Sequence, residues 1–211
     1  MCRLYYYCIA FMVILLCSPC QGLVVEDIPK RTMKNRKTAG DPVNIVIVES
    51  KERIHKTFTS AGWSVADKLS VSKNVRIALD CIFNLSYRKA PVSKLYYLNK
   101  PQDISYQLQY GGSPRKRHHV RFWKIPEQKS NKEVWVGAVS FDKKIKFNRV
   151  TKKFTHKISP DVDKERNMIV KIFKKHGFKS TVIDKFQTKL CGKNGEGDYY
   201  YTDGKLAILE N

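Results

Sequence analysis

The sequence has 211 residues, and 40 Lys and Arg against 19 Asp and Glu give it a formal net charge of +21. Hydrophobic residues make up 42% of the chain, enough to build a core, which excludes a wholly disordered protein. Apolar stretches fall short of the ~20 residues that span a bilayer, which excludes a polytopic membrane protein. The charge predicts an anionic partner.

Residues 1–22 have the layout of a signal peptide. Arg3 precedes an apolar stretch from Leu4 to Cys17, and small residues lie between that stretch and Gly22. The basic residues between Lys30 and Lys37 oppose export of the C-terminal part of the chain. We expect residues 1–22 to be a signal peptide or an N-terminal membrane anchor of an exported protein, periplasmic or secreted, and a cytoplasmic protein remains the alternative.

Only two cysteines, Cys81 and Cys191, lie outside this leader. One disulfide and two unrelated thiols are both compatible with the sequence.

Residues 23–40 are polar and basic and predict a linker, so the folded domain is predicted over residues 41–211. A β-branched run at Val43–Val48 predicts a buried strand. Ser50 caps a helix that ends at Gly62, and a second helix is predicted after Ser72. Further strands are predicted at Leu95–Leu98, Ile104–Tyr110, His118–Ile125, Val134–Phe141 and Val182–Phe186, with a helix from Ser159–Pro160 to Gly177 and a hairpin over Tyr199–Leu209 that turns at Asp203–Gly204.

These elements predict a fold of the α/β or α+β class. We expect a single domain with a mostly antiparallel mixed sheet and about three helices.

The densest cluster of chemically active side chains is the stretch 111–123. On a strand, His119, Arg121 and Trp123 point one way, and His118, Val120 and Phe122 the other. The two apolar residues predict that the His118 face is the buried one. Arg and His side by side suit a phosphate or carboxylate; Arg115, Lys116 and Arg117 would add attraction and Trp123 would lie at the rim. A solvated basic hairpin with a structural histidine is the alternative.

A second cluster lies around the predicted start of the last helix. Capping and local salt bridges explain acidic residues there, yet a metal site or a catalytic acid/base pair is also compatible with this composition. The residues concerned are His156, Asp161, Asp163 and Glu165, with Arg166 beside them.

The sequence resembles the LssY C-terminal domain, a bacterial domain. The resemblance covers about residues 41–177, and its most specific block is the stretch from Gly111 to Trp123. Other matching stretches are Asp41–Asn44, Ala61–Trp63, Ala90–Ser93, Pro101–Asp103, Trp135–Ala138, Thr155–His156 and Pro160–Arg166. The family domain often follows a membrane-embedded phosphatase, but this chain has no Pro-Ser-Gly-His motif, so that chemistry is not carried over.

We therefore expect an envelope-associated domain that binds a phosphate-bearing small molecule or an anionic membrane surface. The expected ligand-binding residues are Arg115, Arg117, His118, His119, Arg121, Trp123 and Arg166. The alternative is a hydrolase, with or without a metal, in which His119, His156, Asp161 and Asp163 are catalytic. No nucleic-acid-reading motif is present, which makes a nucleic-acid partner the weakest option. The sequence identifies no cofactor.

Overall fold

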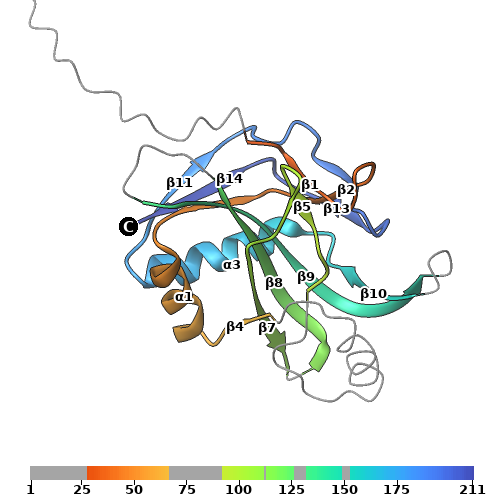
Figure 1. Cartoon of the computed structure of the whole chain (residues 1–211), viewed down its shortest axis with the longest axis horizontal. Helices are drawn as coiled ribbons and strands as arrows, with labels where there is room; N and C mark the ends of the chain where they lie inside the picture. The colour runs from red at the N-terminus through yellow and green to blue at the C-terminus, as the bar shows by residue number, and fades with distance from the viewer. Residues whose placement is uncertain (1–27, 67–91, 112, 126–131, 149–152) are drawn as a thin grey trace, which may run out of the picture.

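The structure, a computed structural model, describes residues 28–66, 92–111, 113–125, 132–148 and 153–211. It is built on an eight-stranded mixed sheet, whose strands lie in the order β11-β14-β3-β9-β8-β7-β4, with β10 paired to the far end of β9 (Figure 1). Among the described strands of this sheet, only β14 and β3 pair in parallel. The strands are β3 Ile45–Val48, β4 Ser64–Val65, β7 Ile104–Tyr110, β8 Ser113–Ile125, β9 Val134–Asn148, β10 Lys153–Ile158, β11 Lys179–Ile183 and β14 Leu206–Glu210.

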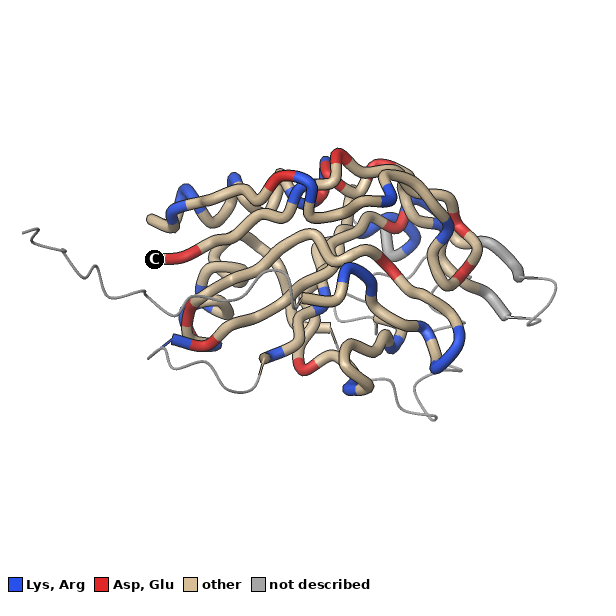
Figure 2. The backbone as a smooth tube through the Cα atoms, turned by 90° about the horizontal axis from the view of Figure 1, so that it is seen from above, with Lys and Arg blue, Asp and Glu red and all other residues tan. Residues whose placement is uncertain are grey.

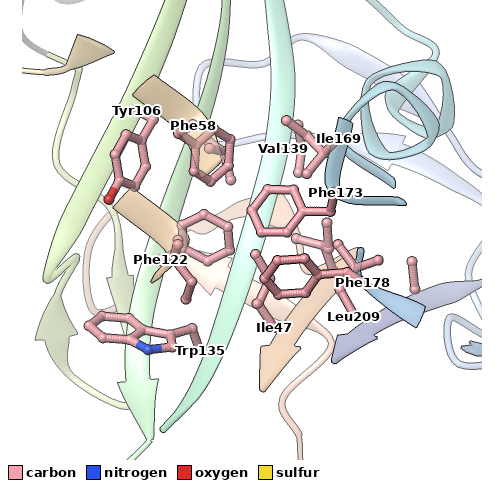
Figure 3. Close-up of a cluster of buried hydrophobic side chains, with 14 of the residues drawn as sticks. Ile47, Phe58, Tyr106, Phe122, Trp135, Val139, Ile169, Phe173, Phe178 and Leu209 are labelled. Atoms are coloured by element: carbon pink, nitrogen blue, oxygen red, sulfur yellow. The ribbon is translucent and has the colours of Figure 1, made fainter. Parts of the chain in front are cut away.

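Two helices, α1 (Lys51–Ser60) and α3 (Val162–Lys175), cover one face of this sheet. Ser50 caps α1, as predicted, because its side chain accepts a hydrogen bond from the Arg53 backbone. The core on this side is rich in aromatic rings: Phe58 of α1 stacks on Tyr106 and meets Phe173 of α3 edge-on (Figure 3). Apolar side chains that recur every second residue on the strands therefore pack against those that recur about every 3.6 residues on the helices, and together they form one apolar layer.

A smaller four-stranded sheet covers the opposite face. Its strands lie in the order β2-β1-β5-β6, namely β1 Arg31–Met33, β2 Ala39–Pro42, β5 Tyr96–Tyr97 and β6 Lys100–Pro101. Leu95 and Tyr97 pack there against Trp123, Val136 and other residues of the large sheet. A third unit pairs β12 Cys191–Lys193 with β13 Tyr199–Tyr201. The central strands of the large sheet are thus buried on both faces, and the α+β class with a mostly antiparallel mixed sheet is confirmed.

Gly137 shows how tightly the central strands pack. It lies directly opposite Phe122 of β8 and Ile45 of β3. A Cβ at this position would come within 2.6 Å of the Phe122 ring and 2.7 Å of the Ile45 side chain. Glycine at this position of β9 therefore leaves the space that the Phe122 ring fills.

Several sequence predictions need correction. Part of the predicted linker, residues 23–40, forms β1 and the start of β2. The last helix begins after Asp161, one residue beyond Pro160. The predicted Tyr199–Leu209 hairpin does not form, because β13 pairs with β12 while β14 pairs with β11 and β3. Two helices are described against the expected three; the helix predicted after Ser72, like the leader and Cys81, lies outside the described residues.

Candidate functional site

Strand β8 carries three charged or polar residues into the space between the two sheets. Arg117, His119 and Arg121 occupy alternate positions and so share one face of the strand. Each of them is only 2–3% exposed. The prediction that the His118 face alone is buried was therefore wrong: helices cover that face and the small sheet covers the other.

Asp142 of β9 joins two of these side chains. Its Oδ2 accepts a hydrogen bond from Nε of Arg117 at 2.9 Å, and its Oδ1 lies 3.0 Å from Nε2 of His119. Nη1 of Arg117 also donates to Gln107 of β7 at 2.9 Å. Strands β7, β8 and β9 thus each contribute to one hydrogen-bonded group.

Arg121 links this group to the small sheet. Its Nη1 donates to Asp41 of β2 at 3.2 Å and to Nδ1 of His119 at 3.2 Å, while Nε and Nη2 donate to the main chain and hydroxyl of Ser93. Because Nδ1 of His119 accepts from a guanidinium, the ring is the neutral tautomer that donates from Nε2 to Asp142. Asn194 donates to the second oxygen of Asp41 at 3.1 Å.

We call Arg117, His119, Arg121, Asp142 and Asp41 the ionic cluster. Its two guanidinium groups and two carboxylates balance in charge, as buried ion pairs require. Burial lowers the pKa of His119, and the nearby guanidinium groups of Arg121 and Arg117 lower it further. Burial acts to raise the pKa of Asp142, but its electrostatic interactions with the His119, His156 and Arg117 side chains, together with the hydrogen bond from His119, outweigh burial and hold that pKa well below the usual value.

His156 of β10 reaches the same carboxylate. Its Nδ1 lies 3.8 Å from Oδ2 of Asp142. Burial and the positive charges of Arg117 and its neighbours lower the pKa of His156 to about 4, so the ring is neutral at neutral pH. Its Nε2 is buried and has no hydrogen-bond partner among the described residues. The two sequence clusters therefore meet at Asp142, a residue that neither of them contains.

On the helix face, His118 makes the other contact between the clusters. Its Nδ1 lies 2.6 Å from Oε2 of Glu165 of α3. The ring also packs against Phe141, with 4.7 Å between ring centroids. This pair ties α3 to the sheet on the face opposite the ionic cluster.

The remaining predicted residues lie elsewhere. Asp161 caps α3 by accepting from the backbone of Asp163 and Lys164. Asp163 and Asp203 both bind Arg166, which is buried and holds the segment before β14 against the helix. Within the described part of the chain, Asp161 and Asp163 contact neither His119 nor His156 through a hydrogen bond or ion pair.

Trp123 and Arg115 show opposite exposure. Trp123 is buried between the sheets, where its Nε1 donates to the Lys100 carbonyl at 3.1 Å, so it does not lie at a rim as predicted. Arg115 is exposed at the start of β8.

Asp142 and Asp41 were not predicted as site residues. Asp142 is the only acidic residue between positions 134 and 160, in a strongly basic stretch. This isolation is the feature of the sequence that could have indicated Asp142 as the partner of buried cations. Nothing local in the sequence pairs Asp41 with Arg121, which lies 80 residues away.

The family described as LssY C-terminus matches residues 25–206, far more than half of the chain. The chain belongs to this family. Comparison with curated proteins gave no match, and neither did comparison with solved structures. The family match includes β1 and β2 and takes in residues 25–40 of the predicted linker.

Two further findings concern what this LssY C-terminal domain can hold. In the described ranges, no three His, Cys, Asp or Glu side chains are placed to hold a metal ion. Neither described helix is long and apolar enough to cross a membrane. The ionic cluster is a closed, charge-balanced network, so attraction for an anion has to come from cations nearer the surface.

Proposed function

We propose that this LssY C-terminal domain binds a phosphate-bearing anion at the corner where β8, β9 and β10 meet. The lysines and arginines of the chain occur all around the backbone (Figure 2), so net charge alone selects no site. The β9–β10 hairpin, however, extends beyond the body of the protein, at the end opposite the C-terminus (Figure 1). We call three of its lysines, together with two cations at the start of β8, the basic corner: Lys143, Lys144, Lys157, Arg115 and Lys116.

One cross-strand pair carries this proposal. Lys144 of β9 lies directly opposite Lys157 of β10 in the ladder. Like charges in this position are destabilising, and a bound anion would relieve their repulsion. Among the described residues, neither these two lysines nor Lys143 forms an ion pair with a carboxylate.

Asp142 does not neutralise these cations. Asp142 precedes Lys143 in β9, but Arg117 and His119 occupy its two oxygens. The ionic cluster therefore has a supporting role in the proposal: it fixes β8, β9 and β10 to one another and leaves the basic corner with positive charge in excess.

A phosphate group reaches such a corner either as a lipid headgroup or as a free phosphate compound. Each basic residue near an anionic membrane contributes about 1 kcal/mol, and the attraction decays within a Debye length. An exported domain, which residues 1–22 suggest, would meet such headgroups at the envelope.

The hydrolase alternative has weaker support. It relied on Asp161 and Asp163 as partners of the histidines, and those carboxylates are engaged in capping α3 and binding Arg166. His119 and His156 do share Asp142, but His119 is buried within the ionic cluster. Binding is therefore the function that the geometry favours.

The double variant Lys144→Gln/Lys157→Gln is expected to weaken binding to anionic vesicles about 30-fold, the factor that corresponds to about 2 kcal/mol. Cosedimentation of the full chain with phosphatidylcholine vesicles containing about one third phosphatidylglycerol measures this. The matched control is Lys171→Gln/Lys175→Gln, which removes two exposed lysines from α3.

The control variant should bind nearly as tightly as the native chain. Equal losses in the two variants would overturn the proposal, since they would mean that only total charge matters. Inorganic phosphate separates the two sources of ligand: if it displaces vesicles better than chloride at equal ionic strength, the corner recognises phosphate itself. If phosphate and chloride act equally, the corner recognises a charged surface.

A further inference from the structure

The outward face of the β12–β13 hairpin is unusually aromatic for an exposed surface. Cys191 lies opposite Tyr201, and Lys193 opposite Tyr199. Directly opposite residues of an antiparallel pair project from the same face. We call these four exposed residues the tyrosine face; Tyr199 is 53% exposed and Tyr201 is 46% exposed. Leu190, which precedes β12, is also exposed.

The inner side of the same hairpin is firmly anchored. Tyr200 points inward and is 1% exposed, in a cluster with Ile158 and Val162. Arg31 of β1 lies over the Tyr200 ring and donates a hydrogen bond to its hydroxyl at 2.6 Å. Tyr199 and Tyr201 are therefore exposed to solvent on an anchored hairpin, and tyrosine is enriched at interfaces because it joins an apolar ring to a polar hydroxyl.

The surroundings of the tyrosine face are basic. Lys189 next to it and Lys193 within it are both exposed. The turn between β1 and β2, with exposed Arg36 and Lys37, is tied to the hairpin because Lys34 donates to the Gly195 carbonyl and pairs with Glu196.

The hairpin also adjoins the strand that carries Lys157. The Ile158 backbone donates to Asp198 at 3.2 Å, and the Tyr201 backbone donates to the Pro160 carbonyl at 2.8 Å. In Figure 1, β13 and β10 lie at the same end of the molecule. The tyrosine face and the basic corner are thus carried by connected elements.

We propose that the tyrosine face docks on an anionic lipid surface, with the two phenol rings at headgroup depth and Lys193 beside the phosphates. This rests on the proposed function and names its ligand as a lipid headgroup in a membrane. Tyrosine suits this place because its ring is apolar and its hydroxyl remains hydrated. Positive charge on the face and around it complements the anionic headgroups.

The double variant Tyr199→Ser/Tyr201→Ser tests the proposal with the same phosphatidylglycerol vesicles. Affinity should fall about tenfold, the ratio expected when each ring loses about 30 Å² of apolar contact with lipid. The loss should persist at high salt, because apolar contact is not screened. Tyr110→Ser, at an exposed tyrosine on β7, is the matched control and should bind like the native chain.

A gain-of-affinity variant guards against a trivial loss through misfolding. Tyr199→Trp/Tyr201→Trp should bind the vesicles more tightly, because Trp prefers the membrane interface. Unchanged vesicle affinity in both the Ser and the Trp variants would overturn the tyrosine face as a lipid contact, and would leave a protein partner as its occupant.

The failure of this inference and that of the proposed function are distinguishable. If only the basic corner is correct, Lys144→Gln/Lys157→Gln loses affinity while the Ser variant binds like the native chain. If only the tyrosine face is correct, the pattern is reversed.

Discussion

Asp142→Asn is expected to lower the free energy of unfolding by about 3–5 kcal/mol, the usual cost of breaking a buried ion pair from one side. The carboxylate accepts from Arg117 through one oxygen and binds His119 through the other. An amide offers only one acceptor, so one of these partners would lose its hydrogen bond, and the buried charge of Arg117 would lose its counter-ion.

Urea unfolding of the native chain and the variant measures this loss. Asp184→Asn is the matched control, because Asp184 is exposed and pairs only at the surface with Lys205. Such a pair contributes about 1 kcal/mol or less. A similar small change in both variants would show that the ionic cluster does not hold the strands together.

Acid is expected to destabilise the protein well above the pH at which ordinary carboxylates titrate. The ordinary pKa of histidine is 6.5, whereas the pKa of His156 in the native protein is about 4. Between these values the unfolded chain takes up a proton that the native chain does not, so falling pH favours unfolding. His119, whose pKa burial also lowers, contributes in the same direction.

The contribution of neutral His156 to the free energy of unfolding is fully present above pH 6.5, the ordinary pKa of histidine. It is lost as the pH falls toward about 4, the pKa of His156 in the native protein. From about pH 7.5 to about pH 5, His156 alone should remove about 2 kcal/mol from the free energy of unfolding. Below the ordinary value of 3.8 for Asp, the lowered pKa of Asp142 adds a further loss.

Chemical denaturation over this pH range measures the effect. His156→Gln removes one titrating group and should flatten the dependence by about the same 2 kcal/mol. A variant whose stability tracks the native pH dependence would contradict the role assigned to His156.

The elements that were predicted correctly are those whose signals are local. Ser50 and the apolar spacing of Ile54 and Phe58 define α1, and the alternation from Ile104 to Tyr110 defines β7. Strand β1 was missed because it is only three residues long and lies in a polar, basic segment, where it pairs with β2 and β5. The Asp203–Gly204 turn does not produce a hairpin, because β14 pairs with β3 and β11 in the large sheet instead of with β13.

In the candidate site, too, the local relations were predicted and the contacts between distant strands were not. Strand periodicity placed His119 and Arg121 on one face of β8 correctly, because that relation spans only two residues. It could not show that the face is buried, since the small sheet that covers it comes from β1, β2, β5 and β6. Strand periodicity also could not predict the parts played by Asp142 and Asp41, because these residues contact Arg117 and Arg121 from other strands.

The most direct test of the central claim is a residue-by-residue map of where a phosphate-bearing lipid binds. Titrating the ¹⁵N-labelled chain with a soluble short-chain phosphatidylglycerol should shift amide resonances at the basic corner, above all those of Lys116, Lys144 and Lys157. Amides of the exposed α3 lysines Lys171 and Lys175 should stay in place. Shifts spread evenly over all exposed lysines, or centred on α3, would contradict a binding site at the β8–β9–β10 corner.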